Sequence, residues 1–317
     1  MFNTVLIVDE VHQILLETLD KKGITYTYLP KISLSEAKNI INNYSGIIIR
    51  SKFKIDKEFI DLSPKLKIIG RVGAGLENID TEYCRSKNIK VVNSPEGNRD
   101  AVGEHALGMI LLLFNKLKQA DLQIRNGIWD RENNRGIELA GKTIAIIGYG
   151  NMGSAFAKKL SGFDVNVIAY DKYKTNFSDK YVKEVTLNEV FENADVVSLH
   201  TPLTEETKYL INSNFIQKFK KPIYIINTAR GQSLNIADLV SELKNGKVLG
   251  ACLDVLEYEK LNFENIAGNN SSESFSYLLN SEKVVLSPHV AGWTDESYVK
   301  ISKVIADKFI VFSQFYI

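Results

Sequence analysis

A short glycine-rich segment constrains this chain more than any other part of it. The apolar run TIAII leads into Gly148-Tyr-Gly150-Asn-Met-Gly153, and the helical pattern SAFAKKLSGF follows at once. Gly148 permits a tight turn, Gly150 lets a pyrophosphate approach the backbone, and Gly153 lets helix and strand pack closely. The next strand pattern, NVIAYD, ends in Asp171, 18 residues past Gly153. A strand, a glycine loop, a helix and an acid in this order predict a dinucleotide-binding α/β unit.

The acid at the end of the second strand distinguishes NAD from NADP. A carboxylate at Asp171 would accept hydrogen bonds from a ribose 2′-hydroxyl and repel a 2′-phosphate, so the expected cofactor is NAD. The competing interpretation, that the glycines serve only a turn, leaves the strand, helix and acid in register with them unexplained. Tyr170 and Lys174 form a Tyr-x-x-x-Lys pair, but they lie at the edge of the adenosine pocket and are interpreted as chance.

Short apolar runs alternate with amphipathic helical patterns along most of the chain. The earlier runs are TVLIVD, ITYTYLP, GIIIRS, KIIGRVG and KVVNSP; the later ones are TIAIIG, NVIAYD, DVVSLH, IYIINT, VLGACLDV and KVVLSP. Such alternation predicts parallel sheets, and near-continuous apolar strands predict sheets covered on both faces. One long helical stretch, AVGEHALGMILLLFNKLKQADLQIRNG, separates the two sets and suits a bridge between domains.

We therefore expect an α/β protein with two Rossmann-like, doubly wound parallel-sheet domains, the first of them discontinuous. At 317 residues the chain is long enough for two domains. Residues 1–98 and 293–317 would form the substrate-binding (catalytic) domain, because the last helical pattern is expected to pack back on the first unit. Residues 99–292 would form the NAD-binding domain.

Composition argues against several classes of function. The net charge is +1, and the lysines in DKYKTNFSDKYVK are interrupted by acids, so no nucleic-acid partner is expected. Cys84 and Cys252 lie in apolar or helical patterns and offer neither a disulfide framework nor a zinc knuckle, so no metal is expected. The start does not resemble a signal peptide, and no uncharged run approaches 18 residues. A cytoplasmic protein without membrane contact is expected.

Polar residues follow the later strands at the ends where open parallel sheets bind ligands. Reduction of a 2-keto acid by NADH needs a cation for the carboxylate, an acid for the carbonyl oxygen, and a group that keeps this acid charged. Arg230 suits the first role because its fork binds a carboxylate through two bonds. His289 suits the second because imidazole titrates nearest to neutrality. Glu259 suits the third because a carboxylate stabilises an adjacent imidazolium and fixes its orientation.

Each of these three residues also has a purely structural interpretation. Arg230 could pair with an acid such as Asp254. His289 could be a hydrogen-bonded histidine at a strand end, and Glu259 could be a loop charge. The functional interpretation is favoured because all three residues follow strands that end at one edge of the sheet.

The remaining histidines are weaker candidates. His200 is the rival acid, but Thr201 and Pro202 directly after it predict a turn against the cofactor, so we rank it below the histidine at the end of the last strand. His12 and His105 lie in helical patterns, which favours packing or interdomain roles.

Over essentially its whole length, the sequence resembles the D-2-hydroxyacid dehydrogenase family. The matching pieces are GRVGAGLENID (70–80), VVNSPEGNRDAVGEHALGMILLL (91–113), GKTIAIIGYGNMG (141–153), HTPLTEET (200–207), INTARG (226–231), GACLDVLEYE (250–259) and SPHVAGW (287–293). The resemblance implies that Arg230, Glu259 and His289 are the catalytic residues and that Asp254 contacts the nicotinamide carboxamide. It also implies a cleft that closes on binding and a homodimer paired through the NAD-binding domains.

The contacts expected on this basis fall into two groups. Those to NAD come from Gly148, Gly150, Asn151, Met152, Gly153, Asp171, His200, Thr201, Pro202, Thr228, Ala229, Arg230, Asp254, His289 and Gly292. Those to a small anionic 2-hydroxy or 2-keto acid come from Arg50, Arg71, Val72, Gly73, Ala74, Arg230 and His289.

The branch of the family that oxidises D-3-phosphoglycerate in serine biosynthesis is most similar in IIIRSKFKID and GRVGAGLENID. Arg50 and Arg71 match the positions that this resemblance assigns to the substrate phosphate, and Lys52 could assist. A phosphate needs cations beyond the one that binds the carboxylate. Arginines at strand ends are also often simply exposed, and branches that act on glyoxylate or hydroxypyruvate share much of the scaffold. Glyoxylate and hydroxypyruvate therefore remain alternative substrates.

Two departures from the family pattern follow Glu259. Lys260 stands where the family usually has proline, and the segment before His289 is long, with a mobile loop expected at GNNSSESFS (268–276). No regulatory domain is expected after the last helix, which argues against serine feedback through such a module. A non-catalytic NAD-sensing scaffold, as in the corepressor branch, is the competing hypothesis, although the sequence shows no clear peptide-binding groove.

Overall fold

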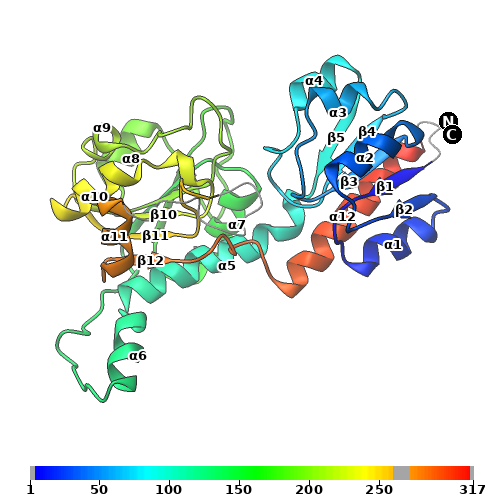
Figure 1. The fold of residues 1–317 in the computed structure, drawn as a ribbon. Coiled ribbons are helices and arrows are strands. Elements are labelled where there is room, and N and C mark those ends of the chain that lie inside the picture. The colour runs from blue at the N-terminus through cyan, green and yellow to red at the C-terminus, as the bar shows by residue number, and fades with distance from the viewer. Residues whose placement is uncertain (1–3, 260–271, 315–317) are drawn as a thin grey trace. The chain divides into compact units, whose positions relative to one another are not determined.

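The computed structural model describes residues 4–259 and 272–314, which form two compact units, each an α/β layer structure around a parallel sheet (Figure 1). The first unit comprises Met1–Arg99 and Trp293–Ile317, and the second comprises Asp100–Gly292. The predicted fold class, with two parallel-sheet α/β domains, is confirmed. Lys260 and the first residues of the predicted mobile loop, 268–271, lie outside the described residues.

The first unit contains a five-stranded parallel sheet in the order β2-β1-β3-β4-β5. Its strands are β1 Val5–Ile7, β2 Tyr26–Tyr28, β3 Gly46–Ile49, β4 Ile68–Arg71 and β5 Lys90–Asn93. Its helices are α1 Gln13–Asp20, α2 Leu34–Ile40, the 3-10 turn η1 Ile41–Asn43, α3 Lys57–Asp61, α4 Thr81–Ser86 and, from the end of the chain, α12 Asp295–Ser313. Ile305 and Phe309 of α12 are buried in one core with β1 and β4, so the last helix completes this unit.

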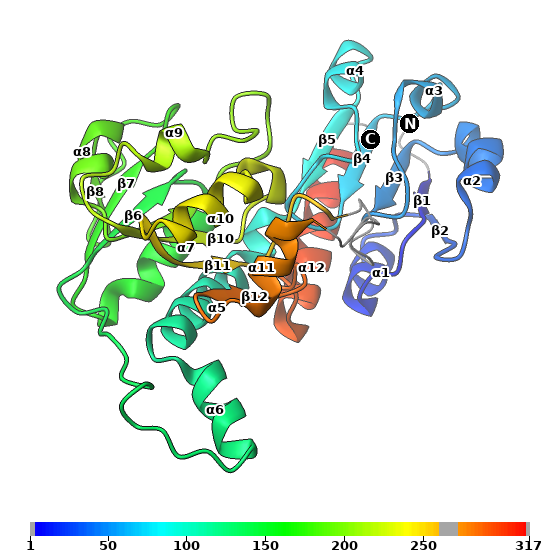
Figure 2. The ribbon, with the colours of Figure 1, turned by 60° about the vertical axis from the view of Figure 1, so that its left-hand side comes forward.

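Two helices replace the single long helix that the sequence predicts between the sheets. Helix α5 runs from Pro95 to Phe114, and α6 runs from Leu117 to Arg125, pointing away from the second sheet (Figure 2). The break is at Lys116, whose φ of 51° is left-handed. The amide of Ile137 donates to the carbonyl of Phe114 at 3.0 Å. A distant segment therefore ends α5, and no local sequence signal announces this contact.

The second unit contains a seven-stranded parallel sheet in the order β12-β11-β10-β9-β6-β7-β8. Its strands are β6 Thr143–Ile147, β7 Asn166–Tyr170, β8 Lys183–Glu184, β9 Val196–Leu199, β10 Ile223–Asn227, β11 Val248–Leu253 and β12 Val284–Leu286. Its helices are α7 Asn151–Lys159, η2 Leu160–Gly162, α8 Leu187–Asn193, α9 Ser213–Ile216, η3 Gly231–Ser233, α10 Ile236–Lys244 and α11 Glu273–Asn280. The short edge strand β8 is a correction, because it is not among the apolar runs that the sequence predicts as strands.

The strand order reverses direction between β6 and β9. Strands β7 and β8 continue on one side of β6, whereas β9 to β12 continue on the other. Open parallel sheets bind their ligands at such a switch point, beyond the carboxyl ends of the strands. The glycine loop follows β6 and His200 follows β9, so both stand at this position.

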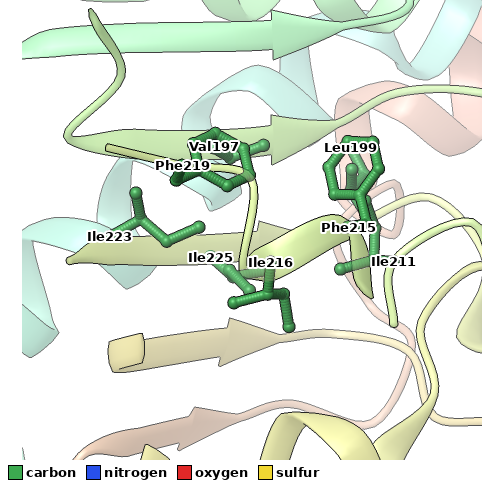
Figure 3. A pocket seen from close by; sticks show the side chains of 8 residues that line it. All are labelled: Val197, Leu199, Ile211, Phe215, Ile216, Phe219, Ile223 and Ile225. Carbon is green, nitrogen blue, oxygen red and sulfur yellow. The ribbon is translucent and has the colours of Figure 1, made fainter. Parts of the chain in front are cut away.

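Both faces of the second sheet are covered, as the sequence predicts. Ala145 and Ile147 pack into one buried cluster, whereas Ile144 and Ile146, which alternate with them, pack into another. Figure 3 shows part of the first of these cores, to which Phe215 and Ile216 of α9 contribute, and the gap between the side chains is too narrow to hold a water molecule. The side chains that line it are Val197, Leu199, Ile211, Phe215, Ile216, Phe219, Ile223 and Ile225. This region is packed core that supports the strand ends.

Helices able to cross a bilayer are not found in the described part of the chain, because none combines enough length with enough apolar character.

Candidate active site

The glycine loop between β6 and α7 is tightly packed at Gly148 and Gly153 and open at Gly150. Gly148 has φ +93°, and a Cβ on it would lie 2.8 Å from the carbonyl oxygen of His200. A Cβ on Gly153 would lie 2.2 Å from the carbonyl oxygen of Gly148, so the strand and α7 touch here. Gly150 caps α7 without a side-chain hydrogen bond, and the space beside its Cα is open. The amino terminus of α7 at Asn151 is therefore a candidate position for a pyrophosphate, because helix amino termini present unpaired amides to anions.

Asp171 is held in place by backbone amides at the end of β7. Its carboxylate accepts hydrogen bonds from the amides of Tyr149 at 2.8 Å, Tyr173 at 2.9 Å and Lys174 at 3.0 Å. Burial alone would raise the pKa of Asp171, but these three bonds outweigh it and lower the pKa. The charge that the sequence analysis needs for a ribose hydroxyl is thus fixed in position at neutral pH.

Three polar atoms after β9 and β10 are buried without a hydrogen-bond partner among the described residues. They are Nδ1 of His200, Oγ1 of Thr201 and Oγ1 of Thr228. Orphaned polar atoms of this kind are costly unless a ligand or water completes them. Together with the open side of the glycine loop, they fit a polar ligand such as a dinucleotide at the switch point.

His200 is unsuited to the acid role for which it was the rival. Burial lowers the pKa of its imidazole to about 3, and its Nε2 forms a hydrogen bond with Oγ of Ser198 at 2.8 Å. The ring also packs against Phe156 with centroids 5.5 Å apart. A histidine that stays neutral throughout the physiological range is a packing and hydrogen-bonding group.

This buried histidine should make the fold sensitive to acid. The pKa of His200 is about 3 in the folded chain and near 6.5 when exposed, so below pH 6.5 the unfolded state binds the proton first. The contribution of neutral His200 to the free energy of unfolding is fully present above pH 6.5. It is lost towards pH 3 at about 1.4 kcal/mol per pH unit. We expect the stability difference between wild type and His200→Gln to change with this slope when melting temperatures are compared from pH 7.5 to 4.5. Parallel pH curves for the two proteins would contradict the expectation.

His289 and Glu259 form a direct pair. Nδ1 of His289 lies 2.6 Å from Oε2 of Glu259, and the other carboxylate oxygen accepts the backbone amide of Leu256. Both side chains are largely buried, with 24% and 20% of their surface exposed. Because an ionised carboxylate can only accept, Nδ1 carries the hydrogen in this pair.

Asp254 builds the loop that carries His289. Its Oδ1 accepts from the hydroxyl of Ser287 at 2.6 Å and the amide of Val290 at 2.9 Å, and its Oδ2 accepts from the amide of Ala291 at 2.9 Å. The amide of His289 itself donates to the carbonyl of Asp254 at 2.7 Å. The φ of His289, 56°, is left-handed, and this network holds the residue there.

Two residues that the sequence analysis did not assign to the site complete this network. Nε2 of His105 lies 2.9 Å from Oγ of Ser287 and 3.5 Å from Oδ1 of Asp254. Since the Ser287 hydroxyl donates to Asp254, its oxygen accepts from Nε2–H of His105. Burial alone would raise the pKa of Asp254, but hydrogen bonds from His105, Ser287 and two backbone amides lower it to about 2. The sequence predicts only a packing or interdomain role for His105.

Arg230 lies beside the loop that carries Glu259. Its Nη1 donates to the carbonyl of Ala229 at 2.7 Å, and the buried side chain of Asn227 spans the turn by bonding the carbonyl of Arg230 and the amide of Ala229, both at 3.0 Å. A Cβ on Gly231 would lie 2.1 Å from the carbonyl of Leu256, so the two loops touch. Strands β10, β11 and β12 are neighbours, and they bring the three predicted catalytic residues to one edge of the sheet.

The remaining predicted cofactor residues lie in or beside elements of the second unit. Gly292 closes this unit directly before Trp293. Met152 belongs to the first turn of α7, and Pro202 follows the strand end of β9. Their contacts to NAD stay predictions.

The predicted substrate residues of the first unit follow two neighbouring strands. Ile49 pairs with Arg71, so Arg50 and Arg71 lie at the carboxyl ends of β3 and β4. A Cβ on Gly73, whose φ is +140°, would lie 1.6 Å from Nη1 of Arg71, so the guanidinium folds over this glycine. Val72 is fully buried, and its amide donates to the carbonyl of Ile49 at 2.9 Å, so neither its side chain nor its amide is exposed to a ligand.

Two further residues complete this strand-end region. The Nζ of Lys52, which the sequence offers as a helper, donates to the carbonyl of Pro30. Ala74 accepts a hydrogen bond from the amide of the Asn93 side chain at its carbonyl, so the backbone of Gly73 and Ala74 is fixed beside Arg71.

The chain is similar to known proteins over most of its length. The model of the family D-isomer specific 2-hydroxyacid dehydrogenase, NAD binding domain, matches residues 107–291. The D-3-phosphoglycerate dehydrogenase of Archaeoglobus fulgidus is 34% identical over 308 residues, which cover 96% of this chain and 56% of that protein. The hydroxypyruvate reductase of Thermotoga maritima is 35% identical over 294 residues, which cover 93% of this chain and 92% of that protein. The chain thus spans about half the length of one relative and nearly all of the other.

A solved structure shows the same fold with ligands bound. The D-lactate dehydrogenase of Aquifex aeolicus, complexed with NAD and lactic acid, superposes with a TM-score of 0.81 at 27% identity. The superposition covers 98% of this chain and 96% of that one.

Proposed function

The chain belongs to the D-isomer specific 2-hydroxyacid dehydrogenase family, and on this basis we propose that it transfers a hydride between NAD and C2 of a small 2-hydroxy acid, D-3-phosphoglycerate first among them. The observation that supports this most strongly is the 2.6 Å pair of His289 and Glu259 at the sheet edge that also carries Arg230. NAD, when bound, accepts the hydride from C2 or returns it.

In the proposed oxidation, His289 acts as the base. Its Nε2 takes the proton of the C2 hydroxyl while the hydrogen on C2 leaves as a hydride, so a hydroxyl becomes a carbonyl. Glu259 accepts from Nδ1–H and stabilises the imidazolium that forms. In the reverse direction the same imidazolium returns the proton to the carbonyl oxygen.

Arg230 is proposed to bind the substrate carboxylate through its guanidinium fork. Two parallel bonds fix both position and plane of the carboxylate, and this turns C2 towards the nicotinamide. The glycine loop, Asp171 and the orphaned atoms after β9 and β10 are proposed to hold the cofactor, with Asp254 at the carboxamide. The geometry of the glycine loop supports this assignment of the cofactor site. None of these cofactor-binding groups takes part in proton transfer in the proposed reaction.

The substrate phosphate is proposed to bind Arg50 and Arg71. Burial lowers the pKa of Arg50, although the nearby Asp9 offsets part of this effect. Among the described residues, its guanidinium has no hydrogen-bond or ion-pair partner, and such a cation favours an anionic ligand. 3-Phosphohydroxypyruvate, the oxidation product, would then enter serine biosynthesis.

A panel of 2-keto acids tests the proposal. NADH oxidation is followed with 3-phosphohydroxypyruvate, hydroxypyruvate, glyoxylate and pyruvate, of which the first two differ only by the phosphate. We expect kcat/KM to be highest for 3-phosphohydroxypyruvate. A rate with glyoxylate or hydroxypyruvate but none with 3-phosphohydroxypyruvate would reject the substrate, and no rate with any acid would reject the reaction and favour a non-catalytic NAD-binding protein.

We further propose that the protein is a homodimer paired through the second unit. Helix α6 has only nine residues and buries none of them in its own chain, and so short a helix is marginal in water alone. Leu122 is 58% exposed and Trp129, just beyond the helix, is 79% exposed. A second copy of the chain would cover the exposed apolar side chains of α6 and of the segment that follows it.

The proposed interface at α6 and Trp129 can be tested by introducing negative charges. Leu122→Asp with Trp129→Asp should convert the dimer to a monomer in light scattering after gel filtration, because two carboxylates would be desolvated at the interface. Leu62→Asp, at a 43% exposed leucine of the first unit, is the matched control and should leave the mass unchanged. An unchanged mass in the double variant would contradict the proposed interface.

A further inference from the structure

Trp293 lies against the guanidinium of Arg50 inside the first unit. The guanidinium carbon is 3.9 Å from the centroid of the indole ring, which is the distance of a close cation–π stack. Trp293 is 47% exposed, so its side chain is only partly covered by the chain. The sequence predicts no role for this tryptophan.

The indole is itself supported from behind. Its ring lies 5.6 Å from that of Tyr298 on α12, and Tyr298 meets His12 edge-on at 5.5 Å. His12 is tied to α12, because its amide donates to Oγ of Ser302 at 3.2 Å. Its Nδ1 also accepts the amide of Ile14 and so caps α1. Trp293, Tyr298 and His12 therefore form a row of contacting rings, with Trp293 at the end next to Arg50.

The backbone of Arg50 is fixed separately from its side chain. One carboxylate oxygen of Asp9 accepts the amides of Arg50 at 2.6 Å, Ser51 at 3.1 Å and Lys52 at 3.3 Å. The guanidinium has no carboxylate within ion-pair distance among the residues that the structure describes. Stacking uses the flat face of a guanidinium and leaves its N–H donors pointing outward in the plane, where a phosphate or carboxylate is bound in two-bond geometry.

We propose that Trp293 is a positioning residue that determines specificity for a substrate with a second anionic group. By holding the Arg50 guanidinium over the indole ring, it presents the donors of that residue to a phosphate on C3 of the substrate. The inference rests on the proposed role of Arg50 and goes beyond it. Its consequence is selective: loss of the stack weakens binding of the phosphorylated acid and leaves the chemistry at C2 unchanged.

The test compares KM and kcat for 3-phosphohydroxypyruvate and hydroxypyruvate in Trp293→Leu and Trp293→Phe. Trp293→Leu should raise KM for 3-phosphohydroxypyruvate roughly 3- to 30-fold, from the size of a desolvated cation–π contact. It should change KM for hydroxypyruvate less than about twofold, with kcat kept for both. Trp293→Phe, which restores a ring, should recover most of the loss. Equal KM changes for both acids, a fall in kcat, or a phenylalanine variant no better than leucine would overturn the inference.

Arg50→Ala separates this inference from the function on which it depends. If wild type prefers the phosphorylated acid and Arg50→Ala removes the preference, but Trp293→Leu keeps it, the inference alone fails. If Arg50→Ala changes neither KM, the phosphate role of Arg50 fails and the role of Trp293 fails with it.

The two tryptophans of the chain allow a second readout. In a Trp129→Phe background, Trp293 is the sole tryptophan, and titration with inorganic phosphate should change its fluorescence. Adding Arg50→Ala should abolish that change. A fluorescence response that persists without Arg50 would overturn the stacked geometry as the reporter of anion binding.

Discussion

Replacing His289 with asparagine should lower kcat for the best 2-keto acid by about 10²- to 10⁴-fold, the usual contribution of a positioned acid–base group. Asparagine fills much of the same space and can still bond Glu259, but it cannot carry a proton to the carbonyl oxygen. NADH binding, measured by fluorescence titration, should change little, because His289 is only one of many residues expected to contact NAD and the proton that it carries acts on the substrate. The assay is steady-state NADH oxidation at saturating substrate.

His12→Asn is the matched control for this substitution. His12 caps α1 through Nδ1, and asparagine is itself a favourable N-cap, so the control makes the same chemical change without touching the second unit. Its kcat at saturating substrate should equal that of wild type, because the row of rings that contains His12 is proposed to affect only KM for the phosphorylated acid. A His289→Asn protein that keeps more than about a tenth of the wild-type kcat would show that another group moves the proton.

Replacing Arg230 with alanine should lower kcat/KM by about 10²- to 10⁴-fold. The lost fork makes two charge-assisted hydrogen bonds to the carboxylate, each worth about 1.5–3 kcal/mol, so the combined loss is roughly 3–6 kcal/mol. Arg230→Lys keeps the charge but loses the planar pair of donors, and it should recover only part of the rate. NADH affinity should stay near the wild-type value.

Arg131→Ala, at an exposed arginine of the same unit, controls for the removal of a positive charge. Its kcat/KM should match wild type. If Arg230→Ala loses NADH binding together with turnover, the guanidinium serves the cofactor, and its assignment to the substrate carboxylate is wrong.

The sequence predicts the sheets well because burial on both faces leaves a local record. Within the runs TIAIIG and KVVLSP, residues 144–147 and 284–286 are all apolar, since alternate residues face two separate cores. The two-residue strand β8 has no such record, because Lys183 and Glu184 belong to an edge that is only partly covered. The break between α5 and α6 is hidden for another reason: the Ile137 amide that ends α5 comes from a segment far along the chain.

The residues of the candidate site also differ in whether the sequence can predict them. His289, Glu259 and Arg230 can be found from the sequence because each follows a strand, and parallel strands end at one edge. Asn227 and Ser287 cannot be found so easily, because they act through short hydrogen bonds that only the folded turn creates. His105 reaches Ser287 across 182 positions of sequence, and its pattern in a helix resembles that of any packing residue.

The most direct test of the proposed chemistry is a crystal structure with NADH and oxamate, an unreactive isostere of a 2-keto acid. We expect the oxamate carboxylate on the fork of Arg230 and its carbonyl oxygen within hydrogen-bond distance of Nε2 of His289. A complex in which these two side chains open onto different cavities, or in which oxamate binds neither of them, would contradict the proposed reaction.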